Sequence, residues 1–73
     1  MKVWESPMAG LLREWKVGPG DSFRAGDELA VLESMKMEIP LVAEMDGKVE
    51  ALLVEPGDFV DEGTHLLRYQ EIP

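Results

Sequence analysis

Hydrophobic and polar residues alternate over short stretches of this chain, with the two-residue period of a β-strand. Residues 48–54 place Val49, Ala51 and Leu53 on one face, and residues 11–17 alternate in the same way, less regularly. No window of eleven or more residues holds a clean helical period. The pattern therefore predicts an all-β protein.

Turn signals divide these stretches. Pro-Gly-Asp stands at 19–21 and again at 56–58, and proline pre-sets φ while glycine supplies a positive φ. Further turns are predicted at Gly26-Asp27 and Gly63-Thr64, each leading into an apolar run. Five prolines and seven glycines leave pieces too short for ordinary helices. We expect about eight short strands, arranged as two sheets or as a flattened β-barrel.

The chain also repeats itself. A shift of 37 residues superimposes residues 8–33 on residues 45–70 without a gap and gives eight identities, most of them at turns. Two copies are too few for a solenoid. They suit a compact fold with a pseudo-two-fold axis. The identical pairs are Met8/Met45, Gly10/Gly47, Val17/Val54, Pro19/Pro56, Gly20/Gly57, Asp21/Asp58, Gly26/Gly63 and Leu29/Leu66.

A length of 73 residues predicts a single domain spanning 1–73. The chain has no cysteine, so it has no disulfide and no thiolate metal site, and we predict no metal site of another kind. The N-terminus lacks the apolar run of a signal peptide, which favours a cytoplasmic location. The starting Met1 and the lack of a Pro/Ala-rich linker favour a free-standing protein.

The charge narrows the choice of partners. Seven Lys and Arg are scattered among fifteen Asp and Glu, giving a net charge of −8. Nucleic acid needs a basic patch, and an anionic membrane surface is disfavoured for the same reason. No segment approaches the length of a membrane span. We expect the acidic residues to keep the domain soluble and monomeric.

Lys36 occupies the middle of the chain, with 35 residues before it and 37 after it. A predicted strand at 29–33 leads in and another at 38–42 leads out, so residues 34–37 should form the tip of the hairpin that joins the two copies. Pro40 cannot donate to a strand ladder, which places it at an edge or a bulge. Function is often carried by such loops on a rigid scaffold.

The segment Glu33-Ser34-Met35-Lys36-Met37-Glu38 resembles the attachment motif of biotinyl domains. Residues 7–10 and 57–63 resemble the opening turn and the closing repeat of that family, so the resemblance covers roughly residues 6 to 69. It is closest to small stand-alone biotin/lipoyl attachment proteins. It implies a barrel-sandwich hybrid fold and biotin covalently bound to Lys36. It also implies a biotin protein ligase whose recognition site comprises Met35 and Met37 together with Glu33, Ser34 and Glu38.

The residues supply no catalytic machinery of their own. A lysine amine attacks an activated acid only when neutral, and its ordinary pKa is about 10.4. His65 is the only histidine and is predicted at a surface or edge-strand position, while Ser34 lacks a partner that would make it a nucleophile. We therefore expect an acceptor and not an enzyme. Glu33 and Glu38 are interpreted as solubilising residues that mark a docking site, in preference to a catalytic carboxylate pair.

Each residue of the motif has a plainer alternative. Met35 and Met37 could be core residues of the hairpin, since methionine usually fills cores. Lys36 could be an ordinary turn lysine. The lysines at 2, 16 and 48 act as internal controls, because none is flanked by methionines.

Three functions remain open. The first is a biotin carrier that moves a carboxyl group between a biotin carboxylase and a carboxyltransferase. The second is a lipoyl carrier, or a dual acceptor, with lipoate on Lys36; the methionine pair favours biotin, because lipoyl motifs typically place an acidic residue before the lysine. The third is an unmodified β-domain used for structure or assembly.

Overall fold

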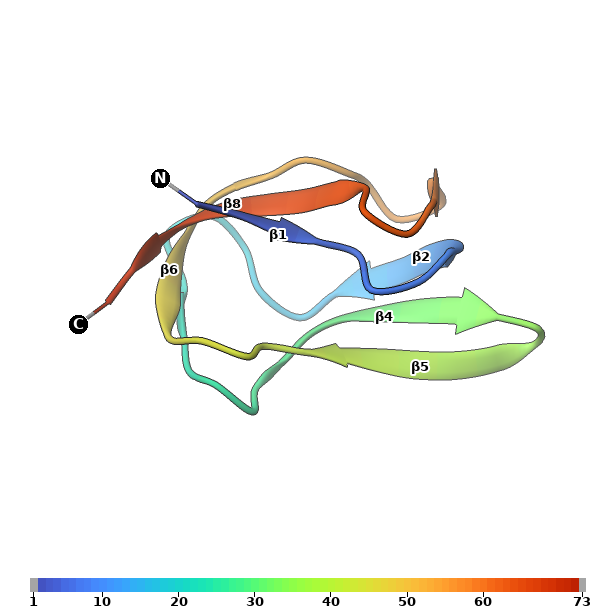
Figure 1. Ribbon diagram of the computed structural model, residues 1–73, viewed down its shortest axis with the longest axis horizontal. Coiled ribbons are helices and arrows are strands. Elements are labelled where there is room, and N and C mark those ends of the chain that lie inside the picture. Colours follow the sequence, from blue (N-terminus) through green and yellow to red (C-terminus); the bar gives the residue numbers. More distant parts are fainter. Residues whose placement is uncertain (1, 73) are drawn as a thin grey trace.

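The computed structural model describes residues 2–72, which form eight strands in two antiparallel four-stranded sheets (Figure 1). The prediction of an all-β fold with about eight short strands is confirmed. One sheet has the order β1-β8-β6-β3 and the other β5-β4-β2-β7. The strands are β1 Lys2–Glu5, β2 Gly10–Trp15, β3 Ser22–Phe23, β4 Glu28–Ser34, β5 Met37–Val42, β6 Gly47–Leu52, β7 Phe59–Val60 and β8 His65–Glu71.

The two sheets are related by the 37-residue shift seen in the sequence. Moving each strand by 37 positions converts β1, β8, β6 and β3 into β5, β4, β2 and β7, with the order of neighbours unchanged. Connecting hydrogen bonds follow the same rule. Lys16 N donates to Leu29 O at 2.8 Å, and Leu53 N donates to Leu66 O at 2.9 Å. The pseudo-two-fold axis therefore extends to individual backbone contacts.

The repeated Pro-Gly-Asp sequence forms the same turn in both copies. Asp21 Oδ2 accepts a hydrogen bond from Gly18 N at 2.8 Å, and Asp58 Oδ2 accepts one from Glu55 N at 2.9 Å. The glycine before each aspartate has a positive φ, 89° at Gly20 and 98° at Gly57. A side chain would be strained there, which explains why glycine occupies both positions.

The core lies between the sheets and forms two clusters. One contains Leu12, Leu32 and Val60, and the other contains Phe23 and Tyr69, whose rings meet edge to face at 5.8 Å. Trp4 and Trp15 contact both clusters and so connect them. The Trp15 indole Nε1 donates to Val54 O at 3.0 Å, which satisfies the one polar atom of that side chain.

Pro40 lies on a strand where the lack of a backbone N–H donor is tolerated. β5 is an edge strand of its sheet, and Pro40 lies within it opposite Val31. This position confirms the expected edge location. Residues 2–72 include no helix with the length and apolar character needed to cross a membrane.

The molecule is elongated, with extents of 36 × 20 × 18 Å. The hairpin of β4 and β5 forms one end of the long axis, and the outer ends of β1 and β8 lie at the other (Figure 1). The Met35–Lys36 connection therefore lies far from the outer ends of β1 and β8.

Gly10 tests the close approach of β2 to β4. A Cβ at this position would lie 2.8 Å from the backbone oxygen of Glu33, an atom that cannot rotate away. We expect Gly10→Ala to lower the free energy of unfolding by about 1–3 kcal/mol, the usual range for overpacking. Urea denaturation measures the change. Gly18→Ala is the control, because its Cβ would meet nothing nearer than 3.9 Å; equal stability of the two variants would contradict this account.

Candidate functional site

The tip of the hairpin is a turn of two residues. Ser34 pairs with Met37 at the last rung of the β4–β5 ladder, which leaves only Met35 and Lys36 in the turn. The connection is thus shorter than the predicted stretch of 34–37. Both turn residues are left-handed, with φ of 53° and 64°. Two successive positive φ values are typical of the type I′ turn that closes tight β-hairpins.

This turn is unfavourable for the residues that occupy it. A left-handed conformation costs a residue with a side chain roughly 1–2 kcal/mol, and type I′ turns ordinarily hold Asn-Gly or similar pairs. Met35 and Lys36 are the only non-glycine residues with positive φ within residues 2–72. The stability of the hairpin therefore does not account for the choice of methionine and lysine.

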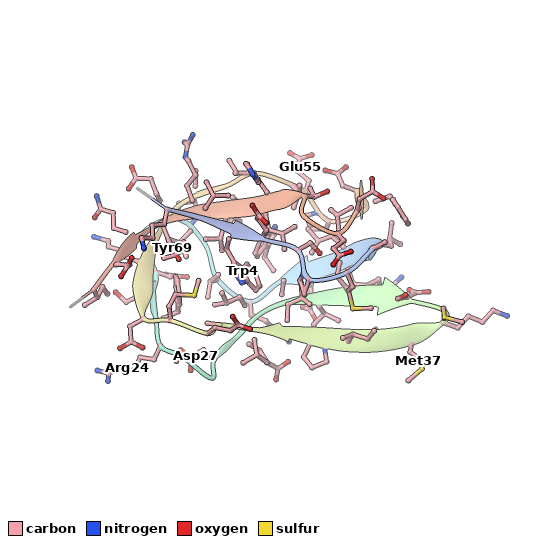
Figure 2. The ribbon with its side chains drawn as sticks, in the orientation of Figure 1. Trp4, Arg24, Asp27, Met37, Glu55 and Tyr69 are labelled. Atoms are coloured by element: carbon pink, nitrogen blue, oxygen red, sulfur yellow. The ribbon has the colours of Figure 1, made fainter. Side chains whose placement is uncertain are left out.

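Both methionines of the motif face solvent. Met35 is 92% exposed and Met37 is 65% exposed. Figure 2 shows Met37 at the hairpin end of the molecule, directed away from the sheets. The alternative that these two residues belong to the core is therefore wrong. The exposed thioethers flank Lys36 and offer a flexible apolar surface to a partner.

Carboxylates lie just behind the turn. Glu33 and Glu38 are directly opposite one another on β4 and β5, an arrangement in which like charges repel. The Arg13 guanidinium lies 3.0 Å from a Glu33 carboxylate oxygen and offsets part of this repulsion. Within residues 2–72, none of the four ion pairs involves Glu38 or Lys36. The lysine thus projects beyond a pair of acids, one of which has a partner.

All six residues of the predicted motif lie on this one hairpin, but the histidine does not join them. His65 is exposed at the start of β8, in the other sheet, with Nε2 3.7 Å from a Glu5 carboxylate oxygen. The surface position is as predicted, although β8 is an inner strand and not an edge. In the described part of the chain, no group of three or more His, Cys, Asp or Glu is placed to hold a metal ion.

The fold and this hairpin agree with what comparison with known proteins finds. The sequence profile of a family described as "Biotin-requiring enzyme" matches residues 2–68. The chain belongs to the biotin/lipoyl attachment domain family. A biotin/lipoyl attachment protein of Bacillus subtilis is 52% identical over 60 residues, covering 82% of each chain. This domain is a biotin/lipoyl carrier domain, homologous to the biotinyl domains of carboxylases.

Larger relatives contain the domain as a small part. Pyruvate carboxylase of Aspergillus terreus is 48% identical over 77% of this chain, and the propionyl-CoA carboxylase alpha chain of Sus scrofa is 37% identical over 93%. The match occupies 5% and 9% of those two proteins. The chain therefore corresponds to a single domain of these enzymes.

Solved structures show the same fold. A single-chain, multi-domain long-chain acyl-CoA carboxylase superimposes with a TM-score of 0.90 and 32% identity, covering 97% of this chain and 7% of that one. The lipoyl domain of the 2-oxoglutarate dehydrogenase complex from Azotobacter vinelandii superimposes with a TM-score of 0.73 and 25% identity, covering 86% of this chain and 80% of that one. The barrel-sandwich fold implied by the resemblance is confirmed.

One contact at the site was not predicted. The register between β2 and β4 shifts between Leu12 and Glu14, which leaves Arg13 as an extra residue in a bulge. The ion pair of Arg13 with Glu33 forms at this irregularity. The alternation is irregular here, because Arg13 and Glu14 are both polar and separate Leu12 from Trp15, but this irregularity alone does not identify a bulge.

Replacing a turn residue tests the backbone constraint. Met35→Asn should raise the free energy of unfolding by about 0.5–1 kcal/mol, because asparagine tolerates left-handed φ and the 92% exposed methionine gives up little packing. Met37→Asn is the control: it alters an exposed methionine in a strand, where asparagine has no such advantage. Denaturant midpoints measure both, and an equal gain in the two variants would refute the constraint.

Proposed function

We propose that Lys36 is the residue that bears the covalent cofactor, and that the cofactor is biotin. The observation that carries this proposal is the position of Lys36 at the apex of the β4–β5 hairpin, between Met35 and Met37, on a domain of the attachment family. An amine at such an apex can enter the active site of another protein without a rearrangement of the sheets.

The chain acts as an acceptor in this scheme. Attachment forms an amide between the Lys36 Nζ and the carboxyl carbon of an activated acid such as biotinyl-adenylate. The bond from that carbon to the adenylate oxygen breaks, the nucleotide leaves with its electron pair, and the amine loses its proton. No side-chain hydrogen bond or ion pair within residues 2–72 involves Lys36, so no neighbour holds the amine in a reactive state. A biotin protein ligase must therefore supply the proton acceptor and the activated biotin.

Two observations support biotin over lipoate. Met35 and Met37 are both largely exposed to a partner, and Met35, which stands directly before Lys36, is not the acidic residue expected before a lipoylated lysine. The relatives named above include two carboxylases, and the carboxylase structure superimposes with a higher TM-score than the lipoyl domain. The Bacillus subtilis relative is named for both cofactors, so lipoate on Lys36 is the second candidate.

Bound biotin would supply a site at which a carboxyl group is held for transfer. We place the domain between a biotin carboxylase and a carboxyltransferase, its two partners in this role. Lys36 stands at one end of a 36 Å long molecule, and the outer ends of β1 and β8 lie at the other. A tether at the outer ends of β1 and β8 would leave the modified end free to move between two sites.

Intact mass spectrometry tests the attachment. After co-expression with a biotin protein ligase, we expect one amide-linked biotin, and none in Lys36→Ala. Lys48→Ala is the matched control, because Lys48 is also exposed and lies on a strand of the other sheet. Biotin retained in Lys36→Ala would overturn the assignment. Lipoyl groups gained from a lipoyl ligase, with no biotin from the first ligase, would establish the second candidate. No modification by either ligase would favour an unmodified structural domain.

Met37 tests the apolar surface beside the lysine. Met37→Ala should slow biotin transfer by about tenfold, the loss expected for one good apolar contact with a partner. Its thermal midpoint should stay within a degree or two of the parent, because the side chain is 65% exposed. Initial rates and circular dichroism measure the two effects. Loss of the β spectrum, or an unchanged rate, would refute the proposed role.

A further inference from the structure

One row of side chains crosses the outer face of the β5-β4-β2-β7 sheet near the hairpin tip. Directly opposed residues on neighbouring strands define it: Glu38 with Glu33, Glu33 with Leu11, and Leu11 with Phe59. The neighbouring residues Leu12, Leu32 and Val60 are buried in the core. Since side chains alternate along a strand, the row itself faces outward. We call these four residues the tip row.

The apolar half of the tip row is open to solvent. Phe59 is 68% exposed, and Leu11 beside it is half-buried. A lone exposed apolar residue is ordinary and needs no explanation. The exposure of Phe59 and Leu11 is informative only if the fold does not require apolar residues there and if the two residues lie near the functional site.

The pseudo-two-fold axis provides an internal control. The equivalent row on the other sheet joins Ser22 to Lys48 and Lys48 to Gln70. Ser22 takes the place of Phe59, Lys48 the place of Leu11, and Gln70 the place of Glu33. These three residues are exposed and polar, in the same strand environment. The fold therefore accepts a polar row, and packing does not explain Phe59 and Leu11.

The two rows lie at opposite ends of the molecule. β7, drawn in orange, is at the hairpin end, and the Arg24 and Asp27 that follow β3 are at the other (Figures 1 and 2). Phe59 is two strands from Glu33, or about 10 Å, and Glu33 is three residues from Lys36, about 10 Å more. A partner of standard interface size, about 800 Å² on each side, would cover both.

The charges around the tip row indicate the charge that a partner surface must carry. Glu38 is outside the ion pairs found in residues 2–72, and the exposed Asp58, Asp61 and Glu62 flank β7. A second copy of this chain would bring the same acids and repel. The complementary surface is an apolar socket for Phe59 with basic residues at its rim.

We propose that the tip row is the surface on which the ligase that modifies Lys36 docks, with Phe59 as its anchor. This inference rests on the proposed function. The ligase is favoured over the later partners because it must bring an activated acid to the lysine amine itself, so its contact area has to enclose the hairpin tip. An aromatic side chain near the centre of such a contact is the usual energetic anchor.

The test exchanges the two rows. Phe59→Ser, alone and with Leu11→Lys, gives the tip the residues of the equivalent row. Ser22→Phe with Lys48→Leu is the control, with an apolar row at the other end. Affinity for the ligase is measured by calorimetry in a Lys36→Ala background, so that no transfer occurs. KM and kcat for biotin transfer are measured with Lys36 present, and circular dichroism confirms folding of each variant.

We expect Phe59→Ser to weaken binding and raise KM by about tenfold with kcat unchanged, and the double variant to do more. The Ser22→Phe, Lys48→Leu control should have the same affinity, KM and kcat as the parent chain. Unchanged affinity and KM in folded Phe59→Ser would overturn the docking surface while leaving Lys36 as the acceptor. No transfer to the parent chain would overturn both proposals. A dimer of the parent that Phe59→Ser dissociates would assign the row to a second copy instead.

Discussion

The structure depends on hydrogen bonds by which each half of the chain completes the other. Gly20 N, in the first Pro-Gly-Asp turn, donates to Val49 O on β6, and Gly57 N, in the second turn, donates to Leu12 O on β2. Each sheet likewise takes strands from both halves. Neither half satisfies all of its own backbone groups, so the two halves within residues 2–72 depend on each other, and no disulfide joins them. This interlocking gives a small core the rigidity that the hairpin needs.

That rigidity is used at the tip. Met35 and Lys36 adopt a backbone conformation that suits neither, and Glu33 faces Glu38 across the ladder. Such local conflicts persist only where the surrounding structure determines the conformation, and they concentrate at functional sites. The long β4–β5 ladder, six opposed pairs, holds the turn in place. The backbone at Lys36 is thereby held in the left-handed conformation of the turn, although the residue types at the turn favour a different conformation.

The turns and the repeat could be predicted from the sequence because Pro-Gly-Asp has a strong local preference. The limits of prediction are equally local. β3 and β7 contain two residues each, too few to show a period. No residue type at or beside Arg13 is characteristic of a β-bulge. The two-residue turn was missed because Met-Lys is not a pair that favours positive φ. The role of Lys36 was inferred from a family resemblance, since no catalytic group near it points to chemistry.

The pseudo-two-fold axis also relates the closed hairpin to the ends of the chain. Lys2 pairs with Tyr69 on β1 and β8 as Ile39 pairs with Leu32 on β5 and β4. The described ends of β1 and β8 thus occupy the position that Met35 and Lys36 close in the other copy. If the outer ends of β1 and β8 were joined, the backbone would form a closed ring of two equivalent halves. The same fold could therefore be formed by a circularly permuted chain in which those ends are joined and the turn between Met35 and Lys36 is opened.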